Sequence, residues 1–350
     1  MLLKRDPFVR ALKTLVTLVP KRSTIPILEN IIIVPTKEGV ALTATDLTTE
    51  ARVIVPANDA LVACLPARKL LEFVSSADRG APIEMSREGS MVRVMSASAS
   101  IELPDRSVAD FPKSMGCDGK TIDVADPTTF VESLAWVARA VGHDVTRPQL
   151  IGVLFDEDRL VATDGHRLHR GTIKGLGCPR ALVPASTVAF VLRAMKNAES
   201  IQITVSDATV RFVSTTWTIT TSMVNAIYPA YEQIIPKPGG AAFTMKVGAR
   251  ELGAGLKRAS GRGGDEPLTL RANGAIKLET CVDGVQRAAT VSVLETTHEG
   301  LDHVQGFNGR YFYDALGDDD ATATLRFYDP ESPVVVNAGD RTAVVMPCRL

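Results

Sequence analysis

The sequence predicts an α+β protein made of three similar domains in tandem, each with two helices and antiparallel sheets. Two observations support this prediction. Apolar pairs with the spacing of one helix face recur at intervals of about 120 residues, and alternating β-branched stretches lie between them. The domains are expected at residues 1–115, 120–237 and 241–350, with turn-rich linkers near 112–120 and 236–240.

The first helix of each domain carries the repeat. Residues at i and i+4 lie on one face of a helix, so matching apolar pairs indicate matching buried faces. The pairs are separated by 122 residues, and they are Phe8 with Leu12, Phe130 with Leu134, and Leu252 with Leu256. The first of these helices is expected over about residues 6–19.

The second helix and the strands repeat in the same order. The stretch "LPARKLLEFV" (65–74) matches "VPASTVAFVL" (183–192) at an interval of 118 residues, and "FNGRYFYDAL" (307–316) is a third copy. Proline is favoured in the first helical turn because its missing N–H costs nothing there. The strand ends "LTATD" (42–46) and "LVATD" (160–164) are also 118 residues apart. Several segments in one order at nearly one interval indicate duplication.

Composition limits the class of protein. The chain has 350 residues, a net charge of −1, 45% apolar residues and 23% charged residues, which is ordinary for a globular protein. Its five cysteines form no CxxC pair, which favours the reducing cytoplasm over a disulfide framework. The first residues lack the pattern of a signal peptide, and no apolar run predicts a membrane span.

Basic side chains gather on the helix faces opposite the buried ones. One such face is most simply a solvated surface, but repetition in three domains favours one basic stripe that contacts phosphates without reading bases. We therefore expect DNA contacts from Arg10, Lys13, Arg68, Lys69, Arg139, Arg193, Lys196, Lys257 and Arg258.

The segment "VATDGHRLHR" (161–170) concentrates charged and histidine residues. Its simplest interpretation is a turn between strands, because Asp-Gly favours tight turns. A hydrolase using His166 and Asp164 is an alternative, but no HExxH, P-loop or GxSxG motif accompanies these residues. We therefore predict no catalytic residue, no metal site and no cofactor.

Eight stretches resemble the bacterial sliding clamp family, the beta subunit of DNA polymerase III. They are "RSTIPILEN", "LTATD", "LPARKLLEFV", "DFP", "RPQLIGVLF", "VATDGHRL", "YPAYEQIIP" and the terminal "VVMPCRL", and they span almost the whole chain. The resemblance implies a clamp ring: two subunits join head to tail around duplex DNA, with helices lining the hole. It also makes Arg22, beside the first helix, an expected DNA contact.

The resemblance further implies a pocket between the second and third domains, where short motifs of partner proteins dock. Carried over by position, its residues are Leu150, Thr163, Gly165, His166, Arg167, Leu168, Pro229, Ile234, Val344, Val345, Met346, Pro347, Cys348 and Arg349. The implied partners are double-stranded DNA, the catalytic subunit of DNA polymerase, the clamp loader, other proteins with clamp-binding motifs, and a second copy of the chain in a homodimer, but no membrane.

Some residues depart from the family pattern. Gln233 and Cys348 replace a usual basic residue and a usual methionine, and the glycine-rich segment 261–264 replaces apolar residues that help to close the dimer.

The resemblance and these departures leave two candidate functions. One is a DNA sliding clamp, a cytoplasmic processivity factor in DNA replication. The alternative is a clamp-fold paralogue that serves as a protein-interaction scaffold without stable DNA encirclement.

Overall fold

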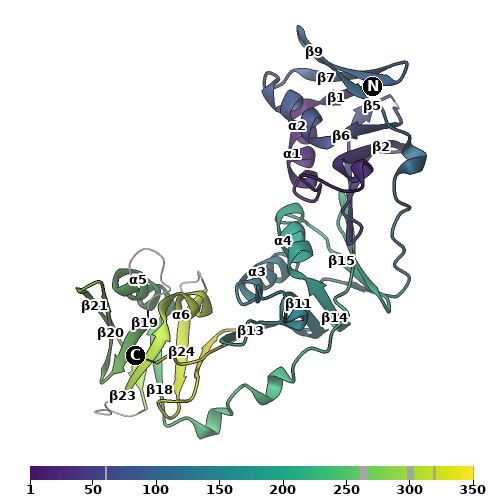
Figure 1. The fold of residues 1–350 in the computed structure, drawn as a ribbon. Coiled ribbons are helices and arrows are strands. Elements are labelled where there is room, and N and C mark those ends of the chain that lie inside the picture. The colour runs from purple at the N-terminus through teal and green to yellow at the C-terminus, as the bar shows by residue number, and fades with distance from the viewer. Residues whose placement is uncertain (60, 261–266, 298–302, 318–320, 350) are drawn as a thin grey trace. The chain divides into compact units, whose positions relative to one another are not determined.

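The computed structural model describes residues 1–59, 61–260, 267–297, 303–317 and 321–349 (Figure 1). The glycine-rich segment 261–264, predicted to weaken the dimer, lies outside the described residues. Contacts group the chain into two compact units. Unit 1 comprises Met1–Val131 and Ser186–Met223, and unit 2 comprises Glu132–Ala185 and Val224–Leu350. In the part of the chain that the structure describes, no helix is long and apolar enough to cross a membrane.

Unit 1 contains two antiparallel sheets. The first has the order β5 (Ala57–Asn58), β1 (Leu2–Lys4), β7 (Pro82–Glu88), β8 (Met91–Ser96) and β9 (Ala99–Pro104). The second has the order β10 (Lys120–Asp123), β15 (Gln202–Val205), β16 (Thr209–Val213), β17 (Trp217–Ser222), β4 (Thr49–Val55), β3 (Gly39–Thr45), β2 (Asn30–Thr36) and β6 (Ala63–Pro66). The helices are α1 (Arg5–Leu15), α2 (Ala67–Ser76) and α4 (Ala185–Ala194), and α1 packs beside α2 (Figure 1).

Unit 2 also contains two antiparallel sheets. One has the order β14 (Cys178–Pro184), β11 (Gly152–Glu157), β12 (Arg159–Thr163), β13 (Arg167–Thr172), β26 (Arg341–Val345), β25 (Val334–Ala338), β24 (Thr322–Phe327), β18 (Phe243–Gly248) and β22 (Glu295–Thr296). The other has the order β21 (Val285–Ser292), β20 (Ala275–Val282), β19 (Pro267–Ala272) and β23 (His303–Asn308). The helices are α5 (Ala249–Ser260), α6 (Gly309–Leu316) and α3 (Pro127–Ala138), whose residues up to Val131 belong to unit 1, and α5 packs beside α6 (Figure 1).

The first helices bury the faces that their spacing predicts. Phe8, Leu12, Phe130 and Leu134 are completely buried. The predicted end of the first helix was wrong, because α1 ends at Leu15 rather than near residue 19. Hydrogen-bonded turns continue the chain beyond this point, so apolar residues after the helix are still buried.

One sheet in each unit crosses a predicted domain boundary. In unit 1, β4 pairs with β17 from Thr49–Thr221 to Val53–Trp217, and we call this pairing the first joint. In unit 2, β13 pairs with β26 from Arg167–Val345 to Gly171–Arg341, and we call this pairing the second joint. Because strand hydrogen bonds continue across both boundaries, each joint brings together residues that are far apart in sequence. The limits of the three domains remain predictions.

Candidate functional site

The "TDGHRL" segment forms the turn between β12 and β13. The Thr163 hydroxyl donates to the carbonyl of Arg167 at 2.6 Å and accepts from the N–H of Gly165 at 3.1 Å. Oδ1 of Asp164 accepts from the N–H groups of His166 and Arg167 at 2.9 and 3.0 Å. Gly165 has a φ of +93°, a conformation that glycine adopts without steric cost. Two polar side chains therefore fix the shape of the turn.

The C-terminal strand runs beside this turn. Leu168 of β13 pairs with Val344 of β26, and the N–H of Met346 donates to the carbonyl of His166 at 2.9 Å. The N–H of Cys348 then donates to the carbonyl of Gly306 at 2.9 Å. The second joint thus brings together two segments that the family resemblance assigns to one pocket.

An apolar cluster lies beneath these segments. The segment 224–241, which follows β17, contributes Tyr228 and Tyr231 to it and packs against it. The buried members are Leu154, Val161, Leu168, Leu182, Tyr228, Tyr231, Tyr328, Val335 and Val344. At the surface, the side chains of Ile234 and Met346 are 45% and 38% exposed. Exposed apolar side chains beside a fixed turn can anchor a short peptide.

The predicted pocket residues divide by exposure. The turn and the strand ends supply exposed groups, whereas the framework is buried. Buried are Leu150, Thr163, Arg167, Leu168, Val344 and Val345; half-buried are Pro229, Pro347 and Cys348; exposed are Gly165, His166, Ile234, Met346 and Arg349. The buried residues shape the site, and the exposed ones can be contacted by a ligand.

Sequence reasoning missed two residues of this region, Tyr311 and Asp314 of α6. The guanidinium of Arg167 lies 4.3 Å from the ring centroid of Tyr311, and its Nη1 lies 2.6 Å from Oδ2 of Asp314. Their spacing of three residues on a helix places both on one face. That spacing is the available signal, although the repeat at "FNGRYFYDAL" by itself predicts only a helix.

The two histidines of the segment do not form a shared site. His166 is exposed, whereas His169 is completely buried and stacks on Trp136 with ring centroids 4.4 Å apart. Its Nδ1 lies 3.0 Å from the carbonyl oxygen of Trp136. Burial lowers the pKa of His169 to about 3, so its imidazole is neutral near pH 7. Among the described residues, no group of His, Cys, Asp and Glu is arranged to hold a metal ion.

Several predicted DNA-contacting residues converge in unit 1. Arg10 and Lys13 of α1 and Arg193 of α4 line one hollow of about 570 Å³, beside the ends of β4 and β17. A neighbouring hollow of about 360 Å³ shares Arg193 and adds Lys196 and Glu199. Within the described residues, none of these four cations forms an ion pair. We call these adjoining spaces the basic hollow.

The remaining predicted cations have varied surroundings. Arg68 donates to the carbonyls of Val16 and Val19 at 3.5 and 2.7 Å, so its guanidinium satisfies backbone groups beyond the end of α1. Lys257 lies 4.6 Å from the ring centroid of Tyr313. Exposed to solvent are Arg22, Lys69 and Arg258, and Arg139 is half-buried. Their contacts with DNA remain predictions.

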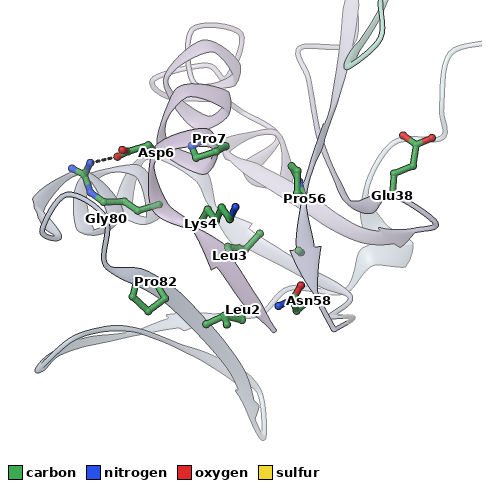
Figure 2. A pocket seen from close by; sticks show the side chains of 12 residues that line it. Leu2, Leu3, Lys4, Asp6, Pro7, Glu38, Pro56, Asn58, Gly80 and Pro82 are labelled. Atoms are coloured by element: carbon green, nitrogen blue, oxygen red, sulfur yellow. Dashed lines mark hydrogen bonds and ion pairs between the residues drawn. The ribbon is translucent and has the colours of Figure 1, made fainter.

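A further hollow of about 460 Å³ lies beside β1, β5 and the start of α1 (Figure 2). Its lining includes Leu2, Lys4 and Asn58 but none of the predicted site residues. Arg5 also lines the hollow and pairs with Asp6 at 2.8 Å, and the dashed line at Asp6 in Figure 2 marks this ion pair. This mixture of proline, aliphatic and charged groups indicates no particular ligand.

Comparison with known families decides the kind of protein that carries these sites. The family model of the DNA polymerase III beta subunit matches its N-terminal domain to residues 1–115 and its central domain to residues 124–230. Together the two matches take in more than half of the chain. The chain belongs to the DNA polymerase III beta subunit family.

Individual relatives agree along the whole length. The beta sliding clamp of Caulobacter vibrioides strain NA1000 is 27% identical, over 95% of this chain and 94% of the relative. The crystal structure of the Caulobacter crescentus beta sliding clamp has a TM-score of 0.87 and 27% identity, over 100% and 98% of the two chains. The Pseudomonas aeruginosa clamp bound to griselimycin has a TM-score of 0.89 and 23% identity, over 100% and 99%. The α+β clamp fold and the sliding-clamp function are confirmed, and no finding supports the scaffold alternative.

Proposed function

We propose that the chain is the non-catalytic processivity subunit of a DNA polymerase holoenzyme. Two copies close around duplex DNA, and polymerase, clamp loader and other partners dock their motifs at the second joint. The observation that carries this proposal is the second joint itself, where the "TDGHRL" turn and the C-terminal strand meet over an apolar cluster. The proposed compartment is the cytoplasm, in agreement with five free cysteines.

The proposed ring follows from the free sheet edges. β17 follows α4 in the second predicted domain and pairs with β4, and β26 follows α6 in the third and pairs with β13. By the same repeat, β9 is the corresponding last strand of the first domain, and β21 corresponds to β4 and β13. Both β9 and β21 are edge strands of described sheets. Edge strands present unpaired N–H and C=O groups to a partner.

A contact between β9 of one copy and β21 of another uses two different surfaces. Such a head-to-tail contact closes into a ring when its rotation closes. We expect light scattering at tens of micromolar protein to give the mass of a dimer. A monomer throughout that range would contradict the ring and would favour the scaffold alternative.

The proposed docking ligand is a short peptide at the second joint. The Pseudomonas aeruginosa clamp was crystallised with griselimycin, and we propose that this chain binds the same compound beside Met346 and His166. Both side chains are exposed, and the apolar cluster fixes the backbone beneath them. Isothermal titration of the full chain with griselimycin tests this proposal. We expect saturable binding that weakens when Met346 is replaced by Ala, and absence of binding would contradict it.

A further inference from the structure

The contacts of Arg167 point to a role for α6 in the docking site. We propose that Asp314 is a positioning residue for peptide docking, which holds Arg167 and, through Arg167, the turn at Asp164–His166. This inference rests on the proposed function, because the docked peptide is the ligand whose affinity Asp314 controls. Asp314 itself is not proposed to touch the peptide.

The Arg167 side chain is nearly enclosed by its partners. It is 8% exposed, and its Nη1 lies 2.6 Å from Oδ2 of Asp314. Its Nε donates to Oδ2 of Asp164 at 3.0 Å, and Tyr311 covers one face of the guanidinium. The two carboxylates are 17% and 14% exposed. A buried guanidinium that loses one partner keeps its desolvation cost, so the remaining contacts rearrange.

The contacts continue from Asp164 to the surface groups of the site. While Oδ2 of Asp164 binds Arg167, Oδ1 accepts the N–H groups of His166 and Arg167. The carbonyl of His166 in turn accepts from Met346. One line of hydrogen bonds therefore joins α6 to the backbone of His166 and Met346, the two residues whose exposed side chains the peptide is proposed to contact.

At the first joint, uncharged hydroxyl groups are enough to connect the helix to the paired strands. There Asp46 accepts from Thr48 and Thr49 in the same manner, at 2.9 and 2.7 Å. The residue in the place of Arg167 is Thr49, whose hydroxyl bonds to those of Thr187 of α4 and Thr221 of β17 at 2.9 and 3.1 Å. This tie connects the helix to the strands, but it does not contact the carboxylate of the turn. At the second joint, by contrast, the Arg167 guanidinium contacts the carboxylate of the turn, that of Asp164, directly.

The test compares D314N and D314E in the full chain. Griselimycin affinity, melting temperature and amide hydrogen exchange are measured for each. We expect D314N to weaken binding about tenfold, since the negative charge that Arg167 contacts is lost, and D314E to recover most of the affinity. The amides of His166 and Arg167 should exchange faster in D314N, while those of the β11–β14 pair remain protected.

The control is E50Q at the first joint. Glu50 is also buried, and its carboxylate accepts from the Ser114 hydroxyl at 2.7 Å and the Met115 N–H at 3.3 Å. We expect E50Q to lower the melting temperature without changing griselimycin affinity. Parent-like affinity in D314N, or uniform acceleration of exchange across the unit, would overturn the proposal. If the parent binds no griselimycin, the proposed ligand site fails, and the exchange measurement still decides whether Asp314 positions the turn.

Discussion

The two joints share one backbone frame. At the first joint the Thr45 hydroxyl donates to the carbonyl of Thr49 and accepts from the N–H of Leu47, as Thr163 does at the second. The N–H of Ser222 donates to the carbonyl of Thr48 at 2.9 Å, the counterpart of the bond between Met346 and His166. A Thr-Asp turn therefore specifies the same local geometry twice, and the side chains around it account for the difference between the joints.

The residues that pair just after the turn differ in polarity between the two joints. At the position of Leu168 the first joint has Glu50, whose carboxylate binds the linker that follows the first predicted domain. Thr220 occupies the place of Val344. Because polar groups satisfy one another at the first joint, it offers no apolar anchor. At the second joint the corresponding residues belong to the apolar cluster, which is the environment that favours peptide docking.

The opposite ends of the two strand pairs also differ. At the first joint the space beside β4 and β17 is open and contains Arg10, Lys13 and Arg193. At the second joint Trp136 occupies the matching region, and the Arg341 guanidinium lies 5.5 Å from its ring centroid. The far end of the first joint is therefore a basic hollow, whereas that of the second contains the contact between Trp136 and Arg341.

The largest expected effect comes from removing residues 346–350, "MPCRL". The deletion strips Met346 and Pro347 from the second joint, and each buried side chain is worth roughly 1.5–3 kcal/mol. We expect griselimycin affinity to fall by about a hundredfold or more, while light scattering still reports a dimer. Isothermal titration measures the first quantity. Parent-like affinity in the truncated chain would refute the docking assignment.

The next effect concerns the basic hollow of the first joint. Replacing Arg10, Lys13 and Arg193 by Glu removes three cations and adds three anions beside the proposed DNA path. We expect the half-life of the clamp on nicked circular DNA to fall about a hundredfold. The slope of log half-life against log salt concentration should become less steep by about 2–3. Replacing Lys246 and Lys277 of unit 2, which form ion pairs with glutamates, is the control. Equal retention of the triple variant and the parent would exclude the hollow as a DNA contact.

The buried histidine of the second joint should make stability depend on pH. Burial lowers the pKa of His169 from 6.5 to about 3, so the unfolded chain binds the extra proton below pH 6.5. The free energy of unfolding that the neutral His169 contributes is fully present above pH 6.5 and is lost as the pH falls toward 3. The loss is about 2 kcal/mol at pH 5. H169F should flatten this part of the profile. Denaturant unfolding at several pH values measures the slope, and identical slopes for H169F and the parent would contradict the assignment.

Local patterns predicted the parts of the structure that depend on near neighbours in sequence. Apolar pairs at i and i+4 identified the buried faces of the first helices, and Asp-Gly identified the turn at Gly165. The end of α1 was misplaced because apolar residues stay buried in the turns after Leu15. Hydrophobic spacing reports burial, and burial does not end where helical hydrogen bonding ends.

The rest could not be predicted because it depends on pairing between distant strands. Arg167 and Asp314 are 147 residues apart, and only the second joint makes them partners. Arg10 and Arg193 belong to different predicted domains, and they line one hollow because the first joint places α1 and α4 at its end. The family resemblance supplied the pocket residues, but the buried role of Arg167 required the fold.

The smallest expected effect lies in the turns themselves. Leu47 of the first joint has a φ of +74° where the second joint has Gly165 at +93°, and its side chain is 50% exposed. A left-handed conformation costs an ordinary residue about 1–2 kcal/mol, while glycine loses about 0.5–1 kcal/mol of chain entropy. We expect L47G to stabilise the chain by up to about 1 kcal/mol, and G165A to destabilise it by about 1 kcal/mol. Denaturant midpoints measure both changes. Because Leu47 lies at the polar joint, L47G should leave griselimycin affinity unchanged, whereas G165A should weaken it a few-fold. A stability loss in L47G would show that the exposed leucine makes a contact that the strained backbone preserves.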